Sequence, residues 1–133
     1  MRTVSIPCKG QTRAPDFDLH HLLTVLAEFT RDLRWKVSGS EALGDAADEL
    51  HAIDDGGKLV STGELLRIAA RVSQTIEGHF KGHGPSDAGR PQLVLRAVDG
   101  TCWDVSSDDD RVLDCVRAEF DAVRELDDVG YGA

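Results

Sequence analysis

The 133 residues of this chain carry a formal net charge of −9; 41% of them are hydrophobic and only 5% are aromatic. This length and apolar content suit one folded domain with a core built mainly from Leu, Val, Ile and Ala. The excess of acid argues against direct binding of nucleic acid or of an anionic membrane surface, because both ligands need a basic footprint.

The three cysteines do not suggest a disulfide framework or a zinc site, because their number is odd and no two have the C-x-x-C spacing. No secretory signal opens the chain, and no apolar run approaches the length of a membrane span. Arg outnumbers Lys 11 to 4, a bias that resembles bacterial coding. We therefore expect a reduced, cytoplasmic bacterial protein without a cofactor.

The N-terminal part predicts an irregular arm followed by a helix. Pro and Gly residues interrupt residues 1–15, so we expect only one short strand there, at 3–6. Leucines recur at helical spacing in the next segment, which predicts a single helix over 17–33. The sequence RWKVS (34–38) then predicts a strand.

Residues 41–55 form an acidic segment with six carboxylates and no basic residue. Inside it, ELHAI (49–53) predicts a strand, and the Asp-Asp-Gly-Gly run that follows predicts a turn. The sequence KLV (58–60) would then pair back as the second arm of a hairpin.

Ser61 and Glu64 have the spacing of a capping box, in which two free backbone amides are satisfied reciprocally. An apolar stripe follows them, so a helix is expected over 62–73. The alternating residues 74–80 predict a half-buried strand, and the Gly- and Pro-rich stretch 81–91 predicts a loop.

The strongest hairpin signal is the Asp-Gly pair at 99–100, which joins two β-rich runs. A two-residue turn at this pair sets Arg96 opposite Trp103, so these two side chains are expected to share a face of the sheet. Asp104 then lies on the other, mostly apolar face, where the pattern gives no reason for a carboxylate.

The last helix is expected to begin within Ser107–Asp110 and to continue to about residue 126, followed by a frayed tail over 128–133. The aspartates at 108–110 have two interpretations. They could bind a divalent cation, or they could stabilise the positive end of the helix. The helix-cap interpretation is favoured, because the sequence supplies no recognisable distant ligand.

Together these elements predict an α+β fold. Residues 16–127 would form a single domain in which three helices pack on a mostly antiparallel sheet of about five to six strands.

A small enzyme, or a ligand- or metal-binding domain, is the alternative function that the sequence leaves open. Glu77 and His79 lie on one strand face and could act as acid and base. His79 and His83 have the H-x-x-x-H spacing of paired metal ligands, although Gly82 and Gly84 break the helix that this spacing needs. Because no nucleophile or nucleotide-binding motif accompanies them, we lean against an enzyme.

The favoured function rests on how the charge is distributed along the chain. Residues 41–55 carry a net −6 and residues 104–128 a net −7, which leaves +4 for the remainder. If the two acidic segments share one side, they would steer a basic partner towards it. We therefore expect a small acidic binding protein, such as an immunity or antitoxin-type inhibitor of a basic partner protein. The expected partner-binding residues are Glu41, Asp45, Asp48, Asp54, Asp55, Asp114, Asp121 and Glu125.

Overall fold

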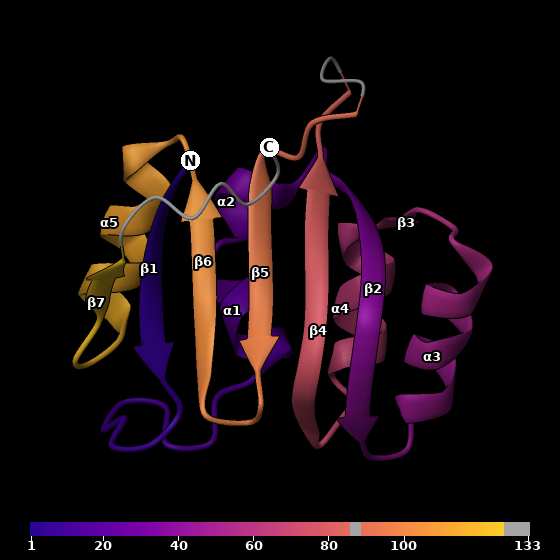
Figure 1. The fold of residues 1–133 in the computed structure, drawn as a ribbon, viewed down its shortest axis with the longest axis horizontal. Coiled ribbons are helices and arrows are strands. Elements are labelled where there is room, and N and C mark those ends of the chain that lie inside the picture. Colours follow the sequence, from indigo (N-terminus) through magenta and orange to yellow (C-terminus); the bar gives the residue numbers. More distant parts are fainter. Residues whose placement is uncertain (86–88, 127–133) are drawn as a thin grey trace.

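The computed structural model describes residues 1–85 and 89–126, which form one antiparallel sheet flanked by helices (Figure 1). The predicted α+β class and antiparallel sheet are confirmed. The described residues form seven strands and five helices, however, instead of five to six strands and three helices. The strands are β1 (Arg2–Pro7), β2 (Arg34–Leu43), β3 (Val60–Ser61), β4 (Gln74–His83), β5 (Leu93–Val98), β6 (Cys102–Ser107) and β7 (Arg124–Leu126). The helices are α1 (Leu19–Val25), α2 (Ala27–Thr30), α3 (Ala47–Gly56), α4 (Thr62–Ala69) and α5 (Asp110–Glu119).

The strands lie in the order β3-β2-β4-β5-β6-β1-β7. Helices α1, α2 and α4 lie behind the sheet in the view of Figure 1, while α5 lies at the β1 end and α3 beside β2 at the opposite end. None of the described helices has the length and apolar content needed to cross a membrane.

The core lies between the sheet and the helices behind it. Because side chains alternate along a strand, β2, β4 and β6 each direct one large aromatic residue into this layer: Trp35, Phe80 and Trp103. Phe80 and Trp103 are in contact, with ring centroids 5.9 Å apart. Leucines from α1, α4 and α5 fill the space behind them.

The other face of the sheet is not covered by any described helix (Figure 1). The alternate residues of β2 and β4 on this face include Lys36 and Lys81, which are directly opposite each other. Towards β1 the side chains are small, and Thr3 and Ser106 are buried there, with a 2.7 Å hydrogen bond between their hydroxyl groups. We refer to this side below as the uncovered face, meaning only that no described helix packs on it.

The β5–β6 hairpin is present, but its register differs by one residue from the predicted one. Asp99 and Gly100 have positive φ (50° and 66°), as the Asp-Gly signal predicts, but Val98 pairs with Cys102 instead of residue 101. A slip of one residue exchanges the faces of a strand. The predicted pairing of Arg96 with Trp103 is therefore wrong: Trp103 is opposite Ala97 on the core side, and Arg96 is opposite Asp104.

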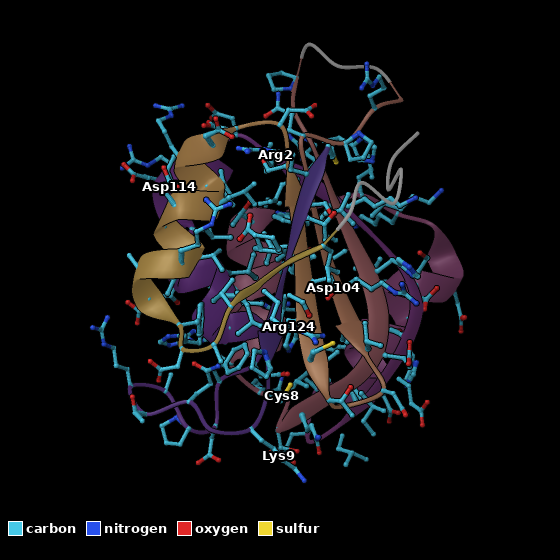
Figure 2. The ribbon with its side chains drawn as sticks, turned by 60° about the vertical axis from the view of Figure 1, so that its left-hand side comes forward. Arg2, Cys8, Lys9, Asp104, Asp114 and Arg124 are labelled. Carbon is cyan, nitrogen blue, oxygen red and sulfur yellow. The ribbon has the colours of Figure 1, made fainter. Side chains whose placement is uncertain are left out.

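This register explains the position of Asp104, whose side chain is only 6% exposed. Asp104 lies on the uncovered face opposite Arg96 on one side and Ser5 on the other. Ser5 in turn pairs with Arg124 of β7, and Figure 2 shows Asp104 and Arg124 close together in that view. The carboxylate thus lies in a cross-strand row that has an arginine on each side.

The predicted hairpin over 49–60 is wrong, because residues 47–56 form helix α3. Ala46 and Leu50 are fully buried, and Ile53 packs beside them, which is the i, i+4, i+7 spacing of a helix. Gly57, with φ 63°, closes the helix in the left-handed conformation. The acidic segment is therefore helical at its centre.

The ends of the chain agree with the prediction only in part. The strand predicted at 3–6 is present as the slightly longer β1 (Arg2–Pro7), which lies inside the sheet between β6 and β7. The helix predicted over 17–33 is interrupted at Leu26 (φ −96°, ψ 17°), which separates α1 from α2. The last helix ends at Glu119, well before residue 126. The tail expected over 128–133 lies outside the described residues.

Candidate functional site

The two acidic segments do not share one side of the molecule. Helix α3 lies beside β2, and α5 lies near β1 and β7 at the far end of the sheet (Figure 1). The eight expected partner-binding residues are therefore divided into two separate groups, which differ in how many of their carboxylates are already bonded within the protein.

The group near α5 is bonded internally. Asp114 and Glu125 both form ion pairs with Arg117, and Asp121 accepts hydrogen bonds from the backbone N–H and hydroxyl of Thr12, at 2.9 and 2.7 Å. These donors hold the pKa of Asp121 and of Glu125 below their usual values. Figure 2 places Asp114 on the outer side of α5. Asp121 thus connects the segment after α5 to Thr12, and Glu125 connects β7 to α5.

One carboxylate of the α3 group, Asp54, and a neighbouring one outside the expected set, Glu49, are also bonded. Asp54 accepts hydrogen bonds from the backbone N–H and the hydroxyl of Ser40, at 2.7 and 2.9 Å, and so joins α3 to β2. Glu49, which sequence reasoning did not single out, forms ion pairs with Arg67 of α4 and with Arg71, which follows that helix. Hydrogen bonds from Arg71, together with the charge of Arg67, hold the pKa of Glu49 below its usual value.

The other members of this group remain available. Glu41, Asp45, Asp48 and Asp55 are exposed, and within residues 1–85 and 89–126 their carboxylates form no hydrogen bond or ion pair. Asp48 and Asp55 are seven residues apart, or about two helical turns, so they lie on the same outer side of α3. The described fold makes no use of these four charges.

Two exposed leucines lie at the ends of the same helix. Leu43 is the last residue of β2 before α3, and Leu59 follows α3 just before β3. Their side chains are 52% and 44% exposed, respectively. Sequence reasoning missed them because a single leucine in a strand or loop is usually buried. We use the name α3 edge for the six exposed residues Glu41, Leu43, Asp45, Asp48, Asp55 and Leu59.

The alternative site around Glu77, His79 and His83 is not assembled in the structure. His79 and His83 both lie on β4, where four residues span about 13 Å, too far for two ligands of one ion. Glu77 accepts a 2.7 Å hydrogen bond from the backbone N–H of Asp99, which anchors the β5–β6 turn. Among the residues that the structure describes, no three His, Cys, Asp or Glu side chains are grouped to hold a metal ion.

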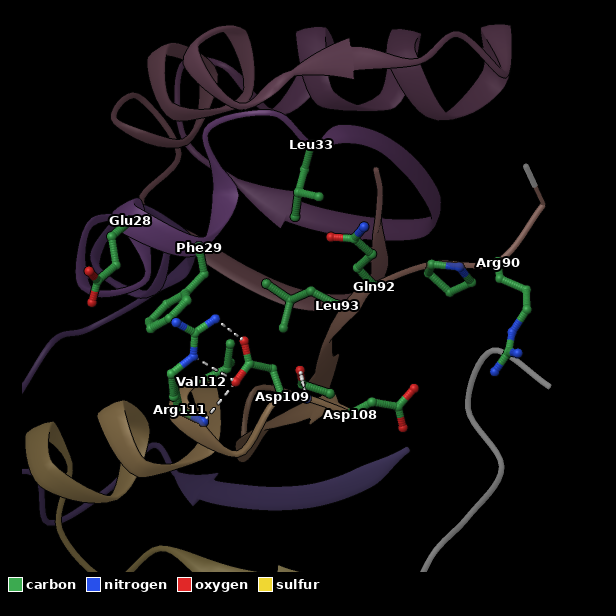
Figure 3. A pocket seen from close by; sticks show the side chains of 12 residues that line it. Glu28, Phe29, Leu33, Arg90, Gln92, Leu93, Asp108, Asp109, Arg111 and Val112 are labelled. Carbon is green, nitrogen blue, oxygen red and sulfur yellow. Dashed lines mark hydrogen bonds and ion pairs between the residues drawn. The ribbon is translucent and has the colours of Figure 1, made fainter. Parts of the chain in front are cut away.

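A cavity of about 480 Å³ lies between α2, the start of α5 and the segment that leads into β5 (Figure 3). Phe29, Leu33, Leu93 and Val112 supply its apolar part. At its mouth the Arg111 guanidinium lies 5.5 Å from the centroid of the Phe29 ring. Sequence reasoning did not predict this cavity, because its walls come from segments far apart along the chain.

The aspartate cluster at the start of α5 confirms the helix-cap interpretation. Asp109 is the N-cap, and its carboxylate accepts hydrogen bonds from the backbone N–H and the guanidinium of Arg111. Asp108 pairs with the ammonium group of Met1 at 3.2 Å, and Asp110 forms an ion pair with Arg2. All three carboxylates are engaged by the protein itself.

A second cavity, of about 390 Å³, lies where α1 begins beside β4. Asp18 lines it and accepts hydrogen bonds from the backbone N–H and the hydroxyl of Thr75, the latter at 2.8 Å. Burial raises the pKa of the Cys8 thiol in this cavity to about 11, with smaller contributions from Cys102 and Asp18. At neutral pH the thiol is therefore protonated, which does not suit a nucleophile.

Among the described residues, the α3 edge combines exposed carboxylates that have no partner with the two exposed leucines, and it is therefore the candidate site. Sequence reasoning identified its charges but not its leucines. Comparison with known proteins adds no further assignment. The chain matches no protein-family model, no curated protein and no solved structure.

Proposed function

We propose that this protein is a small binding protein that recognises a basic partner protein through its α3 edge. The observation that carries the proposal is the combination on this edge of four carboxylates that have no partner among the described residues and two leucines that are about half exposed. Protein interfaces combine an apolar contact with charges that complement those of the partner.

The two kinds of residue would contribute differently to binding. Carboxylates that face water steer a basic partner over distances of about 10 Å at about 0.1 M salt, and over longer distances at lower salt, and this raises the association rate. Leucines that become buried remove apolar surface from water, at about 25 cal/mol per Å², and this slows dissociation. An immunity or antitoxin-type inhibitor of a basic toxin is the specific form of this function that we favour.

The alternative function, catalysis or metal binding around Glu77, His79 and His83, has less support. Glu77 is committed to the turn at Asp99, and the two histidines are separated along β4. A metal-dependent rise in melting temperature that is lost in a His79→Ala variant would restore this alternative.

Charge reversal on the α3 edge tests the proposal. Asp45→Lys/Asp55→Lys removes the attraction for a basic surface, whereas Asp16→Lys/Asp32→Lys makes the same change in net charge at exposed sites elsewhere. We expect tagged wild type and the Asp16/Asp32 variant to retain the same partner from a lysate of the source organism, and the Asp45/Asp55 variant to lose it. Mass spectrometry identifies the retained protein, whose binding constant is then measured with purified components.

The expected result has three parts: the partner is basic, its affinity falls as salt rises, and the Asp45/Asp55 variant binds roughly tenfold or more weakly, mainly through slower association. Equal retention by both charge-reversal variants would place binding elsewhere on the molecule. An acidic partner would contradict the proposed chemistry.

A second variant separates the contribution of the two leucines to binding from that of the carboxylates. Leu43→Ser/Leu59→Ser leaves every charge in place, so we expect it to dissociate faster while the dependence of association on salt stays unchanged. Surface plasmon resonance with the purified partner measures both rates. An unchanged dissociation rate would show that the two leucines are not part of the interface.

A further inference from the structure

The uncovered face of the sheet carries a cluster of basic side chains on β2 and β4. Lys36 is directly opposite Lys81, and Arg34 is directly opposite His83. His79, two residues before Lys81, belongs to the same face and is opposite Ser38. We use the name basic strip for the five residues Arg34, Lys36, His79, Lys81 and His83.

Folding does not account for this arrangement. Like charges directly opposite each other on neighbouring strands destabilise a sheet, and Lys36 and Lys81 are such a pair. The chain has 24 acidic residues, yet none of the described ones forms an ion pair with a side chain of the basic strip. Glu77, the acidic residue of β4 on this face, is bonded to Asp99. Arg34, Lys36 and Lys81 therefore have no acidic partner among the described residues of a protein that is acidic overall.

The behaviour of His79 gives a second sign of the positive potential here. Burial lowers the pKa of its imidazole, and the charges of Arg96 and Lys81 lower it further, while Glu77 acts in the opposite direction. Arg96 lies next to His79 on the neighbouring strand β5. Adding another positive charge to the basic strip is thus unfavourable, whereas binding of an anion there is favourable.

We infer that the basic strip is a second interaction surface, which binds an acidic segment of a partner protein in an extended conformation. Side chains on one face of a strand repeat every two residues, or about 6.6 Å, which is also the spacing of carboxylates at alternate positions of an extended peptide. Neighbouring strands are about 4.8 Å apart, so the ammonium groups of Lys36 and Lys81 can reach one carboxylate between them.

An acidic protein segment fits this surface better than nucleic acid does. Surfaces that bind single-stranded nucleic acid offer aromatic side chains on which the bases stack. The described aromatic residues belong to the core or pack against it on the helical side of the sheet, and none lies on the basic strip. The net charge of −9 also opposes the approach of a polyphosphate.

This inference goes beyond the proposed function, since it concerns a different surface with the opposite charge and a partner of the opposite chemistry. The test uses a fluorescein-labelled peptide of about twelve residues with alternating Glu and Ser, whose binding is followed by fluorescence anisotropy at about 20 and about 200 mM NaCl. We expect the wild type to bind this peptide, with an affinity that falls at the higher salt concentration.

Two charge-matched variants locate the binding. Lys36→Glu/Lys81→Glu changes the basic strip, and Lys9→Glu/Arg31→Glu makes the same change in net charge at exposed positions elsewhere. We expect at least about tenfold weaker binding in the first variant and a change of less than about twofold in the second. Equal effects in the two variants, or no binding by the wild type, would overturn the inference. Tighter binding of an oligothymidylate of equal charge would overturn it in favour of nucleic acid.

A single substitution separates lost binding from lost folding. Lys36→Glu replaces a repulsive cross-strand pair by an attractive one, so it should raise the melting temperature while it weakens peptide binding. A more stable protein that binds the peptide less well would show that the strip is kept for binding and not for folding. If Lys36→Glu binds the peptide as tightly as the wild type does, the inference fails.

Discussion

Asp18 shows how a charged residue can connect elements inside this fold. Its carboxylate accepts hydrogen bonds from Thr75 and from the indole of Trp103, and so links the start of α1 to β4 and β6. Burial nevertheless raises the pKa of Asp18 above its usual value, because the hydrogen bonds only partly offset the loss of water. The folded state therefore holds this proton more tightly than the unfolded state does. The resulting stabilisation is present at low pH and is lost as the pH rises through the folded pKa.

Removal of the Thr75 hydroxyl should have a pH-dependent effect. Thr75→Val deletes a donor to the ionised carboxylate of Asp18, so we expect the free energy of unfolding to fall by about 1.5–3 kcal/mol near pH 7. The loss should shrink near pH 4, where more of Asp18 is protonated and the deleted bond was weaker. Urea unfolding at the two pH values measures this. Thr24→Val, which removes an exposed hydroxyl from α1, is the control and should change stability by less than about 0.5 kcal/mol. Equal losses at both pH values would show that the bond does not depend on the charge.

Local signals predicted single elements well wherever the physical cause lay within a few residues. The capping box before α4 is the clearest case: Ser61 is the N-cap, and its hydroxyl accepts a 3.1 Å hydrogen bond from the backbone N–H of Glu64. The Asp-Gly turn at 99–100 and the acidic cap of α5 were found for the same reason. Each depends on backbone geometry that a few neighbouring residues decide.

The contribution of the α4 cap can be measured directly. Ser61→Ala leaves the Glu64 amide without this acceptor, so we expect a loss of about 1 kcal/mol in the free energy of unfolding. Ser61→Asp keeps an acceptor at the N-cap and should retain most of the stability. Urea denaturation of the three proteins compares them. Equal destabilisation by both substitutions would mean that another property of Ser61, and not its capping, is responsible.

Elements whose identity depends on distant packing were predicted poorly. The segment 49–53 resembles a strand when viewed alone, and its helical spacing becomes clear only when Ala46 and Leu50 are known to face the core. The hairpin register failed for a related reason. Thr101 is an extra residue in the connection, and its place is decided by packing Trp103 against Phe80. The α3 edge was therefore only partly predictable: its acidic residues are visible in the sequence, but its exposed leucines are not.

At the scale of the whole molecule, charge is segregated by position in the fold. The α3 edge is acidic, whereas the basic strip on the adjoining β2 and β4 is positive. The sequence indicated this only as a surplus of +4 outside the two acidic segments. A cluster of cations spaced two residues apart on separate strands can be recognised only once the strand order is known.

The first strand lies inside the sheet between β6 and β7, and this gives a test at the same scale. Ile6, which belongs to the strand predicted at 3–6, is fully buried. Ile6→Ala should lower the free energy of unfolding by about 2–5 kcal/mol, as in a central core position. Lys9→Ala, just beyond the strand, should change it by less than about 0.5 kcal/mol. Chemical denaturation measures both variants, and a small effect at Ile6 would show that β1 contributes little to the stability of the core.

The position of β1 also affects when the protein can fold during its synthesis. Val4 pairs with Val105 and Glu125, so the first strand has no partner in the sheet until most of the chain has been translated. At roughly 5–20 residues per second, the wait between making Val4 and making Val105 is on the order of 5–20 s. Once it has been synthesised, the β5–β6 hairpin can close in about 1–10 μs. The free edge of β6 is then available for pairing with β1. Strand β1 is thus made well before the two strands with which it pairs.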